Sequence, residues 1–358
     1  MGKSSKERVF AALNLEEPDA VPLFDFVYEN RSFENILGYR LDAVTPKVLV
    51  EGHKALNLDF LCSGPGSPEG WMDKRLPPDI KVDEWGIKWK YTREYIALPW
   101  YLEGPIRNPE DIEAYCMPDP HAPGRLKDLE SVLKIVGDDL AVAAAFPIGG
   151  PFTAASMLMG FAPFLKTVMT KPHLASKLLK AQVDYCIEIG ERCVEAGVEI
   201  IFLNDDLGDV HGPLLAPKLF RKHVLPHLKT LTETFKKRDV KVLLHCDGNV
   251  KPIMGDLVDM GIDGFHPMER KAMMDIREMK TMYGDRLCLI GNVDASILLP
   301  LGKPEEIREQ VIECMENAAP SGGYIFASDH SIHPGIPGDR AKLLFKTAEK
   351  YRRYPIRA

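Results

Sequence analysis

KVLLHCDGNVKPIMGDLVDMGIDGFHPM, residues 241–268, contains the repeat that decides the fold. It opens with an apolar run of strand length, KVLLHCDG, continues through a stretch long enough for a helix, and ends in a second apolar run, GIDGFHPM. Strands that are covered on both faces have such near-continuous apolar runs, and neighbouring parallel strands need a crossover, usually a helix. The stretch therefore predicts a β–α–β unit with parallel strands.

The same alternation extends over the whole chain. Six more apolar runs end in polar residues or glycine: VPLFDF from Val21, LDFLCSG from Leu58, LAVAAAFPIGG from Leu140, EIIFLNDD from Glu199, LCLIGNVD from Leu287 and GGYIFASD from Gly322. Eight alternating units predict a closed parallel sheet. We predict one α/β domain over residues 1–358, a (β/α)8 TIM barrel, and the chain has a suitable length for one.

Helix-start signals agree with this pattern. A proline follows a helix-opening residue at four places: Thr45-Pro46, Lys171-Pro172, Ala216-Pro217 and Lys303-Pro304. We predict that the second of these helices runs to Glu195, with Gly197 just past its end. The third is predicted to run to about Lys237.

One segment departs from the alternation. Residues 65–120 contain DEWGIKWKYT and YIALPWYLEGP, which alternate in the manner of a β-hairpin. Three of the four tryptophans, Trp85, Trp89 and Trp100, lie in this segment. We predict an insertion after the second strand that covers part of the barrel mouth. The alternative is an edge hairpin with no role in binding substrate.

The composition limits the kinds of partner and environment. A net charge of −7 and a pI of about 5.9 argue against nucleic acid or an anionic membrane as partner. No stretch of about 18 apolar residues is present, and the opening MGKSSKERVFAALN lacks the apolar region of a secretion signal. The seven cysteines are odd in number and form no CxxC, which predicts reduced thiols in a cytoplasmic protein.

Polar residues gather where the predicted strands end, and in α/β barrels the active site lies at the carboxyl ends of the strands. Five of the ten histidines fall within a few residues of these ends: His211, His245, His266, His330 and His333. The candidates for binding substrate at the same ends are Asp25, Tyr28, Asn204, Asn292 and Asp329. This concentration predicts a functional polar site at one end of the barrel.

A mononuclear metal centre is a more specific hypothesis for this polar site. His245 and Asp247 alternate on one strand, so both side chains point the same way, while Cys246 points to the other face. With His330 from the last strand they make three ligands and leave a position open, as in catalytic zinc sites. The alternative is a hydrogen-bonded His–Asp pair that fixes a loop or binds substrate directly.

Two further pairs of residues near the strand ends have predicted roles. Asp205 and Asp206 are adjacent, so only one of them can face the pocket, and the other is expected to hold a loop or cap a helix. Gly248 and Asn249 predict a tight turn into a helix, with Asn249 as its N-cap.

Several segments, taken in order, resemble the uroporphyrinogen decarboxylase superfamily. They are KERVFAALNLEEPDAVP near the N-terminus, NDDLGDVHGPLLAPKLFRKHVLPHLK from Asn204, HCDGNVKPIMGDLVDMGIDGFHPME from His245, GDRLCLIGNVD from Gly284, GGYIFASDHSIHPGIP from Gly322 and the closing EKYRRYPI. The likeness covers nearly the whole chain and implies the α/β barrel.

The two branches of this superfamily differ in chemistry. True decarboxylases need no cofactor and carry an arginine-rich segment after the first strand, which binds substrate carboxylates. The matching segment here, FDFVYENRSFENILG, has only Arg31. A substrate with many carboxylates needs several cations. The resemblance therefore implies the other branch, zinc-dependent methyltransferases that move methyl groups between small molecules and the cobalt of a corrinoid protein.

The resemblance also implies a ligand set. Coenzyme M methyltransferases of that branch bind zinc through a His-x-Cys on the fifth strand and a cysteine on the last, and the matching positions here are His245, Asp247 and His330. A set without sulfur is harder and leaves zinc a stronger Lewis acid. This favours demethylation of a small methyl ether, with His266 or Asp206 as proton donor, Glu269 as a further catalytic candidate, and a partner corrinoid protein as methyl acceptor.

Two other functions stay open. A cofactor-independent decarboxylase that acts on a different carboxylic acid would hold no metal and need no corrinoid protein. A non-enzymatic barrel would bind a tetrapyrrole or another ligand, although the ring of titratable residues argues against it. Barrels of this kind often form homodimers, and no patch in the sequence indicates one here.

Overall fold

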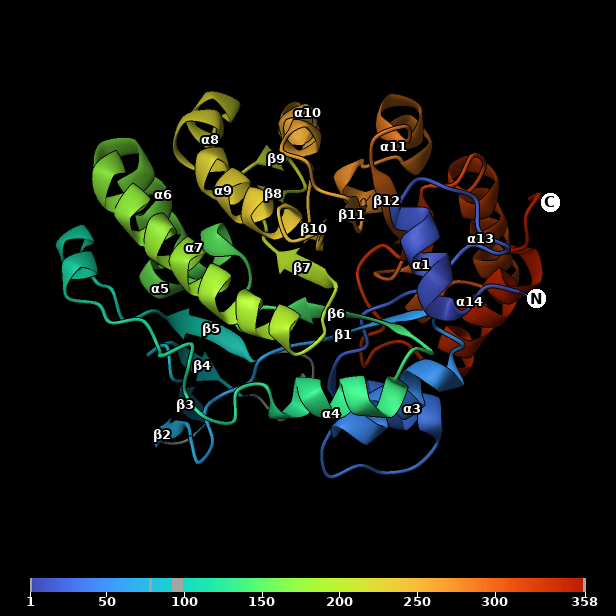
Figure 1. The fold of residues 1–358 in the computed structure, drawn as a ribbon, viewed down its shortest axis with the longest axis horizontal. Helices are drawn as coiled ribbons and strands as arrows, with labels where there is room; N and C mark the ends of the chain where they lie inside the picture. Colours follow the sequence, from blue (N-terminus) through green and yellow to red (C-terminus); the bar gives the residue numbers. More distant parts are fainter. Residues whose placement is uncertain (1, 77–78, 92–98, 357–358) are drawn as a thin grey trace.

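The computed structural model describes residues 2–76, 79–91 and 99–356. Its centre is one parallel sheet with seven strands, in the spatial order β1 (Phe60–Ser63), β6 (Ala141–Ala145), β7 (Ile200–Asn204), β10 (Lys241–His245), β11 (Gly264–His266), β12 (Cys288–Val293) and β13 (Tyr324–Ser328). The sheet curls, and helices surround its outer side (Figure 1). Each strand lies within one of the predicted apolar runs, so seven of the eight predicted strands are confirmed.

The eighth predicted strand, VPLFDF from Val21, is not a regular strand. Pro22 has no N–H to donate to a ladder, and the segment makes only single bridges, from Leu23 to Phe326 and from Val27 to Ile332. On its other side, the amide of Asp59 donates to the carbonyl of Leu23 at 2.8 Å. The segment thus lies between β13 and β1, where the eighth strand was expected, but it is irregular.

Three helices precede β1 in the chain, and the others follow strands of the central sheet or the antiparallel sheet. They are α1 (Ser5–Leu13), α2 (Glu29–Leu37), α3 (Pro46–Ala55), α4 (Lys127–Val136), α5 (Pro151–Met159), α6 (Phe161–Thr170), α7 (Pro172–Glu195), α8 (Pro217–His223), α9 (Leu225–Lys236), α10 (Lys251–Asp259), α11 (Ile276–Tyr283), α12 (Leu298–Leu301), α13 (Pro304–Ala318) and α14 (Gly338–Tyr351). Short 3-10 turns cover Pro109–Glu113 and Arg270–Ala272, and β8 (Gly208–Asp209) pairs with β9 (Gly212–Pro213).

The predicted helix starts at Pro46, Pro172 and Pro304 are confirmed, and α7 ends at Glu195 as expected. The helix predicted from Pro217 to about Lys237 is instead two helices, because α8 ends at His223 and α9 begins at Leu225. Pro226 explains the break, since a proline inside a helix removes a hydrogen bond and clashes with the preceding turn.

No single helix among the described residues is long and apolar enough to cross a membrane, although α5 and α6 together would pass by length and composition across a bend of 106°. All seven cysteines are free, which agrees with the prediction of reduced thiols.

The inside of the curled sheet is filled by aromatic side chains. Phe24 lies 4.6 Å from Phe60 between ring centroids, and Phe26 lies 5.2 Å from Phe202. These side chains and the inward residues of the strands form a buried cluster with Val9, Ala12 and Leu13 of α1. The interior is therefore a packed core, as in α/β barrels, and the polar residues lie at its end.

A separate antiparallel sheet has the order β2 (Lys74–Leu76), β3 (Ile80–Val82), β4 (Lys88–Lys90) and β5 (Trp100–Glu103). It follows β1 in the chain and anchors on α7, where the ring of Trp85 lies 4.7 Å from that of Tyr185. Trp89 donates to Asp83 at 2.7 Å. Residues 95–98, which begin the predicted YIALPWYLEGP strand, lie outside the described residues.

Asp59 joins the ends of the chain at the start of β1. Its buried carboxylate accepts hydrogen bonds from the amide of Leu23 at 2.9 Å and from the guanidinium groups of Arg352 at 2.6 Å and Arg8 at 3.2 Å. Arg352 is also buried. The carboxylate therefore ties α1, the C-terminal region and the irregular segment that closes the sheet (residues 21–28, the closing segment) to the sheet.

Replacing Asp59 with alanine should destabilise the protein by about 3–5 kcal/mol, because it leaves Arg352 buried without its partner. Urea unfolding followed by circular dichroism would measure this loss. The control is Asp139→Asn, since Asp139 is exposed and only 3.6 Å from the exposed Lys54, and its effect should stay within about 0.5 kcal/mol. Equal effects of the two substitutions would contradict the role given to Asp59.

Candidate metal and active site

Three neighbouring strands bring the candidate residues together. In the parallel register, His245 at the end of β10 is paired with Asn204 on β7 and with His266 on β11. Side chains alternate between the two faces along each strand, so register partners of parallel strands point to the same side. The carboxyl ends of all three strands also meet at one edge, and Asp206 and Asp247, which follow β7 and β10, lie beside His245 there.

Asp206, His245 and Asp247 form a cluster in which one ligand atom from each lies within 4.8 Å of the others. His245 Nε2 is 3.7 Å from Asp247 Oδ1 and 3.9 Å from Asp206 Oδ1. The amide of Asp247 donates to Asp206 Oδ1 at 3.1 Å, which fixes the two carboxylates relative to each other. Asp247 Oδ1 is buried and accepts no hydrogen bond from the described part of the chain. Two carboxylates and an imidazole that converge in this way can hold a divalent cation such as zinc.

His266 contacts Nδ1 of His245, the ring nitrogen opposite the one that faces the carboxylates. The two Nδ1 atoms are 2.7 Å apart, and the rings stack with their centroids at 5.0 Å. The side chain has an exposure of 0% and lies among the rings of Phe24, Phe26 and Phe202. Burial, with a further contribution from His245, holds the pKa of His266 well below its ordinary value, so this imidazole is neutral. The structure therefore places the predicted proton donor against His245, without access to solvent.

His330 reaches the cluster from the loop after β13. Its Nε2 lies 3.2 Å from Asp247 Oδ2, and its side chain is 38% exposed, against 9% for His245. Burial disfavours the imidazolium, but the hydrogen bond to Asp247 and the nearby carboxylate charges together outweigh this effect and raise the pKa of His330. Burial also opposes ionisation of Asp247, yet His245 and His330 outweigh it and hold the pKa of Asp247 below its usual range. The predicted third ligand thus contacts the cluster through Asp247.

The adjacent acids Asp205 and Asp206 point in different directions, as predicted. Asp205 is buried and accepts hydrogen bonds from the amides of Phe152 at 3.2 Å and Thr153 at 2.6 Å, in the first turn of α5. Burial raises the pKa of Asp205 to about 7. Burial also raises the pKa of Asp206, and His245 partly offsets this rise. Asp205 therefore holds a helix, and Asp206 belongs to the cluster.

The turn after β10 is tight, as predicted. Gly248 has a φ of +84°, and a Cβ there would lie 2.6 Å from the amide nitrogen of Asp209, so only glycine fits without strain. The N-cap of α10 is Val250, one residue later than predicted. Asn249 still contributes, because its side-chain oxygen accepts a hydrogen bond from the amide of Lys251 at 3.2 Å.

Four of the predicted site residues hold loops in place. Glu269 accepts from the amide of Gly248 at 2.9 Å, Asn292 donates to the carbonyl of Met268 at 2.9 Å, Asp329 accepts from the amide of Ala295 at 2.8 Å, and Asp25 accepts from the amide and hydroxyl of Ser328 at 2.9 Å each. All four are buried. The structure brings them to the strand ends but does not include them in the cluster.

Tyr28 and Asn204, predicted to bind substrate, line a cavity of about 260 Å³ together with two residues that the sequence did not single out, Cys62 and His53. Cys62 lies at the end of β1, so its position in the chain could have identified it. His53 lies in the last turn of α3, where nothing in the sequence marks it as a site residue. His211 and His333 stay outside the cluster, and His333 Nε2 lies 3.1 Å from the carbonyl of Ala295.

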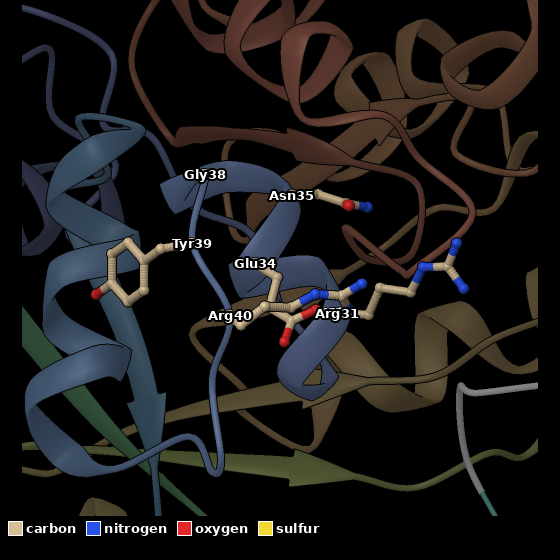
Figure 2. A pocket seen from close by; sticks show the side chains of 6 residues that line it. All are labelled: Arg31, Glu34, Asn35, Gly38, Tyr39 and Arg40. Carbon is tan, nitrogen blue, oxygen red and sulfur yellow. Dashed lines mark hydrogen bonds and ion pairs between the residues drawn. The ribbon is translucent and has the colours of Figure 1, made fainter.

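A larger pocket of about 430 Å³ opens on the outside of α2 (Figure 2). It is lined by Arg31, Glu34, Asn35, Gly38, Tyr39 and Arg40. Arg40 pairs with Glu34 at 3.0 Å, and Arg31 extends to the other side of the helix in the view of Figure 2. This pocket shares no lining residue with the cavity at the strand ends. Arg31, the one arginine of the closing segment and α2, therefore supplies no cation to that cavity.

The fold and the site together define an α/β protein with a curled parallel sheet and a polar cluster at its carboxyl edge. The sequence profile described as uroporphyrinogen decarboxylase (URO-D) matches residues 76–351, so the chain belongs to this family. The superfamily predicted from the sequence is thereby confirmed.

Relatives within the family carry both chemistries. Methylcobamide:CoM methyltransferase MtaA of Methanosarcina barkeri is 27% identical over 229 residues, and the match spans 64% of each chain, just under two thirds of that relative. The uroporphyrinogen decarboxylase of Psychromonas ingrahamii is 24% identical over 250 residues, 68% of each chain. Among solved structures, a methyltransferase from Methanosarcina mazei has a TM-score of 0.78 at 22% identity and covers 97% of this chain and 99% of its own. That likeness confirms the fold.

Replacing Asp247 with asparagine should lower the pKa of His330, because the carboxylate 3.2 Å from His330 Nε2 stabilises the imidazolium. The measurement is an NMR titration of the metal-free protein, with the His330 signal assigned from a His330→Gln variant. Asp209→Asn serves as control, since Asp209 is at the same edge but binds the amides of His211 and Gly212. An unchanged His330 titration in the Asp247→Asn variant would show that the pair does not form in solution.

Proposed function

We propose that this protein is a methyltransferase that moves a methyl group from a small methyl ether to the cobalt of a corrinoid carried by a partner protein, with zinc in the Asp206–His245–Asp247 cluster. The observation that carries the proposal is the convergence of these three side chains at the carboxyl edge of the sheet. The names of family relatives add support, since MtaA is a methylcobamide:CoM methyltransferase and a Methanosarcina mazei relative, 23% identical over 304 residues, is a methylated-thiol–coenzyme M methyltransferase.

The residues present fit a zinc ion. The ligand atoms lie within 4.8 Å of one another, and the buried Asp247 Oδ1 has no other partner among the described residues. Zinc accepts both imidazole nitrogen and carboxylate oxygen, and three protein ligands leave a fourth position open for substrate. Asp206, His245 and Asp247 would hold the ion, and His330 would stand beside it through its contact with Asp247.

The contact between His245 and His266 is compatible with the tautomer of His245 that metal binding requires. His245 Nε2 faces the carboxylates, so a metal needs that nitrogen unprotonated and the proton of His245 on Nδ1. Nδ1–H then donates to His266 Nδ1, 2.7 Å away, and the proton of the neutral His266 lies on Nε2. Partners of this kind orient a metal-binding histidine and raise its affinity for the metal. We assign His266 this positioning role.

The proposed reaction transfers a methyl group from an ether oxygen to cobalt. The bond between the methyl carbon and the ether oxygen breaks, both bonding electrons stay on the oxygen, and the oxygen takes up a proton to give an alcohol or phenol. The methyl carbon forms its new bond with the electron pair of the partner's reduced cobalt(I), which is thereby oxidised to cobalt(III). When bound, zinc would supply Lewis acidity that draws electron density from the ether oxygen.

His330 is the residue best placed to hold the proton for the leaving oxygen. Its Nε2 points to Asp247 Oδ2, and its side chain is the most exposed of the imidazoles in contact with the cluster, at 38%. Asp247 keeps the ring oriented, and Ser331 contacts the opposite nitrogen, Nδ1, at 2.7 Å. A ligand set of oxygen and nitrogen suits an oxygen leaving group, because hard ligands leave the metal a strong Lewis acid.

Protein purified without chelators should contain about one zinc per chain. His245→Ala should lose the metal, and His266→Ala should bind it about 10–100-fold more weakly, because a metal-binding histidine depends on its hydrogen-bond partner. Mass spectrometry of the metal and competition with a chelator would measure both effects. His211→Ala is the control, since His211 lies on the exposed β8–β9 turn. Wild-type protein that stays free of metal after zinc is added would refute the zinc site.

Mixed with a methyl ether and a reduced corrinoid, the zinc-loaded protein should form methylcobalt, which changes the visible absorbance. Asp247→Ala should lower this rate by at least about 100-fold, because it removes a proposed ligand and the partner of His330. The control variant Asp209→Asn should keep the rate. Release of carbon dioxide from a carboxylic acid by metal-free protein, without methylcobalt formation, would instead identify the protein as a decarboxylase.

A further inference from the structure

Tyr28 ends the closing segment and lines the cavity of about 260 Å³ at the carboxyl ends of β1, β6 and β7. Its backbone is tied to the loop that carries His330. The amide of Tyr28 donates to the carbonyl of Ile332 at 3.3 Å, and the amide of Ile332 donates to the carbonyl of Phe26 at 2.8 Å. Tyr28 and His330 therefore extend from two segments that hydrogen bonds hold side by side.

The ring of Tyr28 stacks on that of Phe26. The two rings lie at 6° to each other with centroids 5.7 Å apart, and the ring of Phe26 lies 5.7 Å from that of His245. Asn204, which also lines the cavity, is the register partner of His245 on the neighbouring strand. The cavity therefore borders the Asp206–His245–Asp247 cluster, and Phe26 fixes the orientation of the Tyr28 ring between them.

The hydroxyl of Tyr28 is available to a ligand, since it makes no hydrogen bond within the described part of the chain. Burial raises the pKa of Tyr28, and Cys62, Asp247 and Asp206 raise it further. The hydroxyl is therefore within electrostatic range of the cluster, and it keeps its proton at neutral pH. A neutral phenol of this kind donates a hydrogen bond without giving up the proton.

Most other polar groups of the lining are already bound or point elsewhere. His53 Nδ1 lies 2.8 Å from a backbone carbonyl of its own helix, and Asp25 is bonded to the last residue of β13. Ser63 follows Cys62 on β1, so its side chain points to the opposite face of the sheet. The thiol of Cys62 is only a weak donor. The phenol is therefore an unused donor on the inner side of the cavity.

The charges around the cavity would tolerate an oxyanion once the cluster holds a metal. Asp206 and Asp247 carry two negative charges, which a divalent ion would balance, and the raised pKa of His330 favours a positive charge there. Asp25, the acid of the lining, is only partly ionised at neutral pH, because burial raises its pKa to about 7. A neutral donor such as Tyr28 would then stabilise charge that develops on a substrate oxygen.

We infer that Tyr28 is a catalytic residue whose hydroxyl donates a hydrogen bond to the oxygen that leaves when the bond between methyl carbon and oxygen breaks. The inference rests on the proposed function, because it assigns a role in the same reaction. The oxygen keeps both electrons of the broken bond and takes its proton from the imidazolium of His330. The methyl carbon bonds to cobalt(I) of the partner corrinoid, which becomes cobalt(III). Tyr28 keeps its own proton throughout.

Calorimetric titration of the zinc-loaded protein with 4-nitrophenol and with 4-nitroanisole at pH 8.5 tests the hydrogen bond without a corrinoid. The first probe is then a phenolate and stands for the leaving oxygen, whereas the second is the neutral methyl ether. Tyr28→Phe should weaken phenolate binding at least about tenfold, because hydrogen bonds to charged groups are the stronger ones, and ether binding by less than about twofold. Equal losses for both probes, unchanged phenolate binding, or no phenolate binding by the wild type would overturn the inference.

Single-turnover methylcobalt formation from the methyl ethers of phenol, 4-chlorophenol and 4-nitrophenol tests the role in catalysis. Tyr28→Phe should slow transfer from the phenol ether by about 100-fold. The loss should shrink along the series, because a better leaving oxygen needs less stabilisation. Tyr39→Phe is the matched control, since Tyr39 is 45% exposed and lines the separate pocket on α2. A loss of equal size for all three ethers would show that Tyr28 only shapes the cavity, and would contradict the inference.

The two assays separate the inference from the proposed function. Phenolate binding that depends on the Tyr28 hydroxyl, without methylcobalt formation from any ether, would refute the methyltransferase proposal and leave the hydrogen bond to a bound oxyanion intact. Methylcobalt formation at the same rate in wild type and Tyr28→Phe would refute the inference and leave the methyltransferase proposal intact. Zinc content and thermal unfolding show that each variant is folded.

Discussion

The parallel direction of the seven central strands is the constraint on which the rest of the structure depends. Because every carboxyl end lies at one edge, residues far apart in sequence become neighbours there, and the register of β7, β10 and β11 aligns Asn204, His245 and His266. The aromatic core fills the space below this edge, so polar groups gather only where the core ends. The buried carboxylate of Asp59 then ties the closing segment and both ends of the chain to this sheet.

The site has two layers with different surroundings. The lower layer is the neutral His266 among phenylalanine rings, which orients His245 from behind. The upper layer is the cluster of carboxylates and imidazoles, in which Asp247 stays ionised because His245 and His330 outweigh the cost of its burial. This arrangement leaves carboxylate and imidazole ligand atoms facing one point, with His330 on the more exposed side. Metal-assisted chemistry requires a ligand that is held in a fixed orientation and a charged group that substrate can reach. Here His266 and the surrounding rings would supply the first, and the cluster would supply the second.

Two features of the strand ends bear on the proposed chemistry. By the resemblance in sequence, Asp247 and His330 stand where coenzyme M methyltransferases have cysteine ligands. In the structure Asp247 lies beside His245, and His330 lies beside Asp247. Arg31 lies in a separate pocket on α2, so the cavity beside the cluster is uncharged apart from Asp25. The oxygen and nitrogen atoms of this cluster fit the zinc site and the small ether of the proposed function.

The sequence alone determined the regular strands and the starts of α3, α7, α8 and α13, because apolar runs and prolines at helix starts are local signals. It also identified His245 and Asp247 as neighbours, since alternation along one strand fixes that relation. It could not distinguish Asp206, which joins the cluster, from Asp329, Asn292 and Glu269, which hold loops, because all lie at strand ends and differ only in their partners. It also could not show that Pro22 would make the closing segment irregular, or that His53 from a helix would line the cavity. Those outcomes depend on which distant groups satisfy each buried hydrogen bond, and only the tertiary structure decides that.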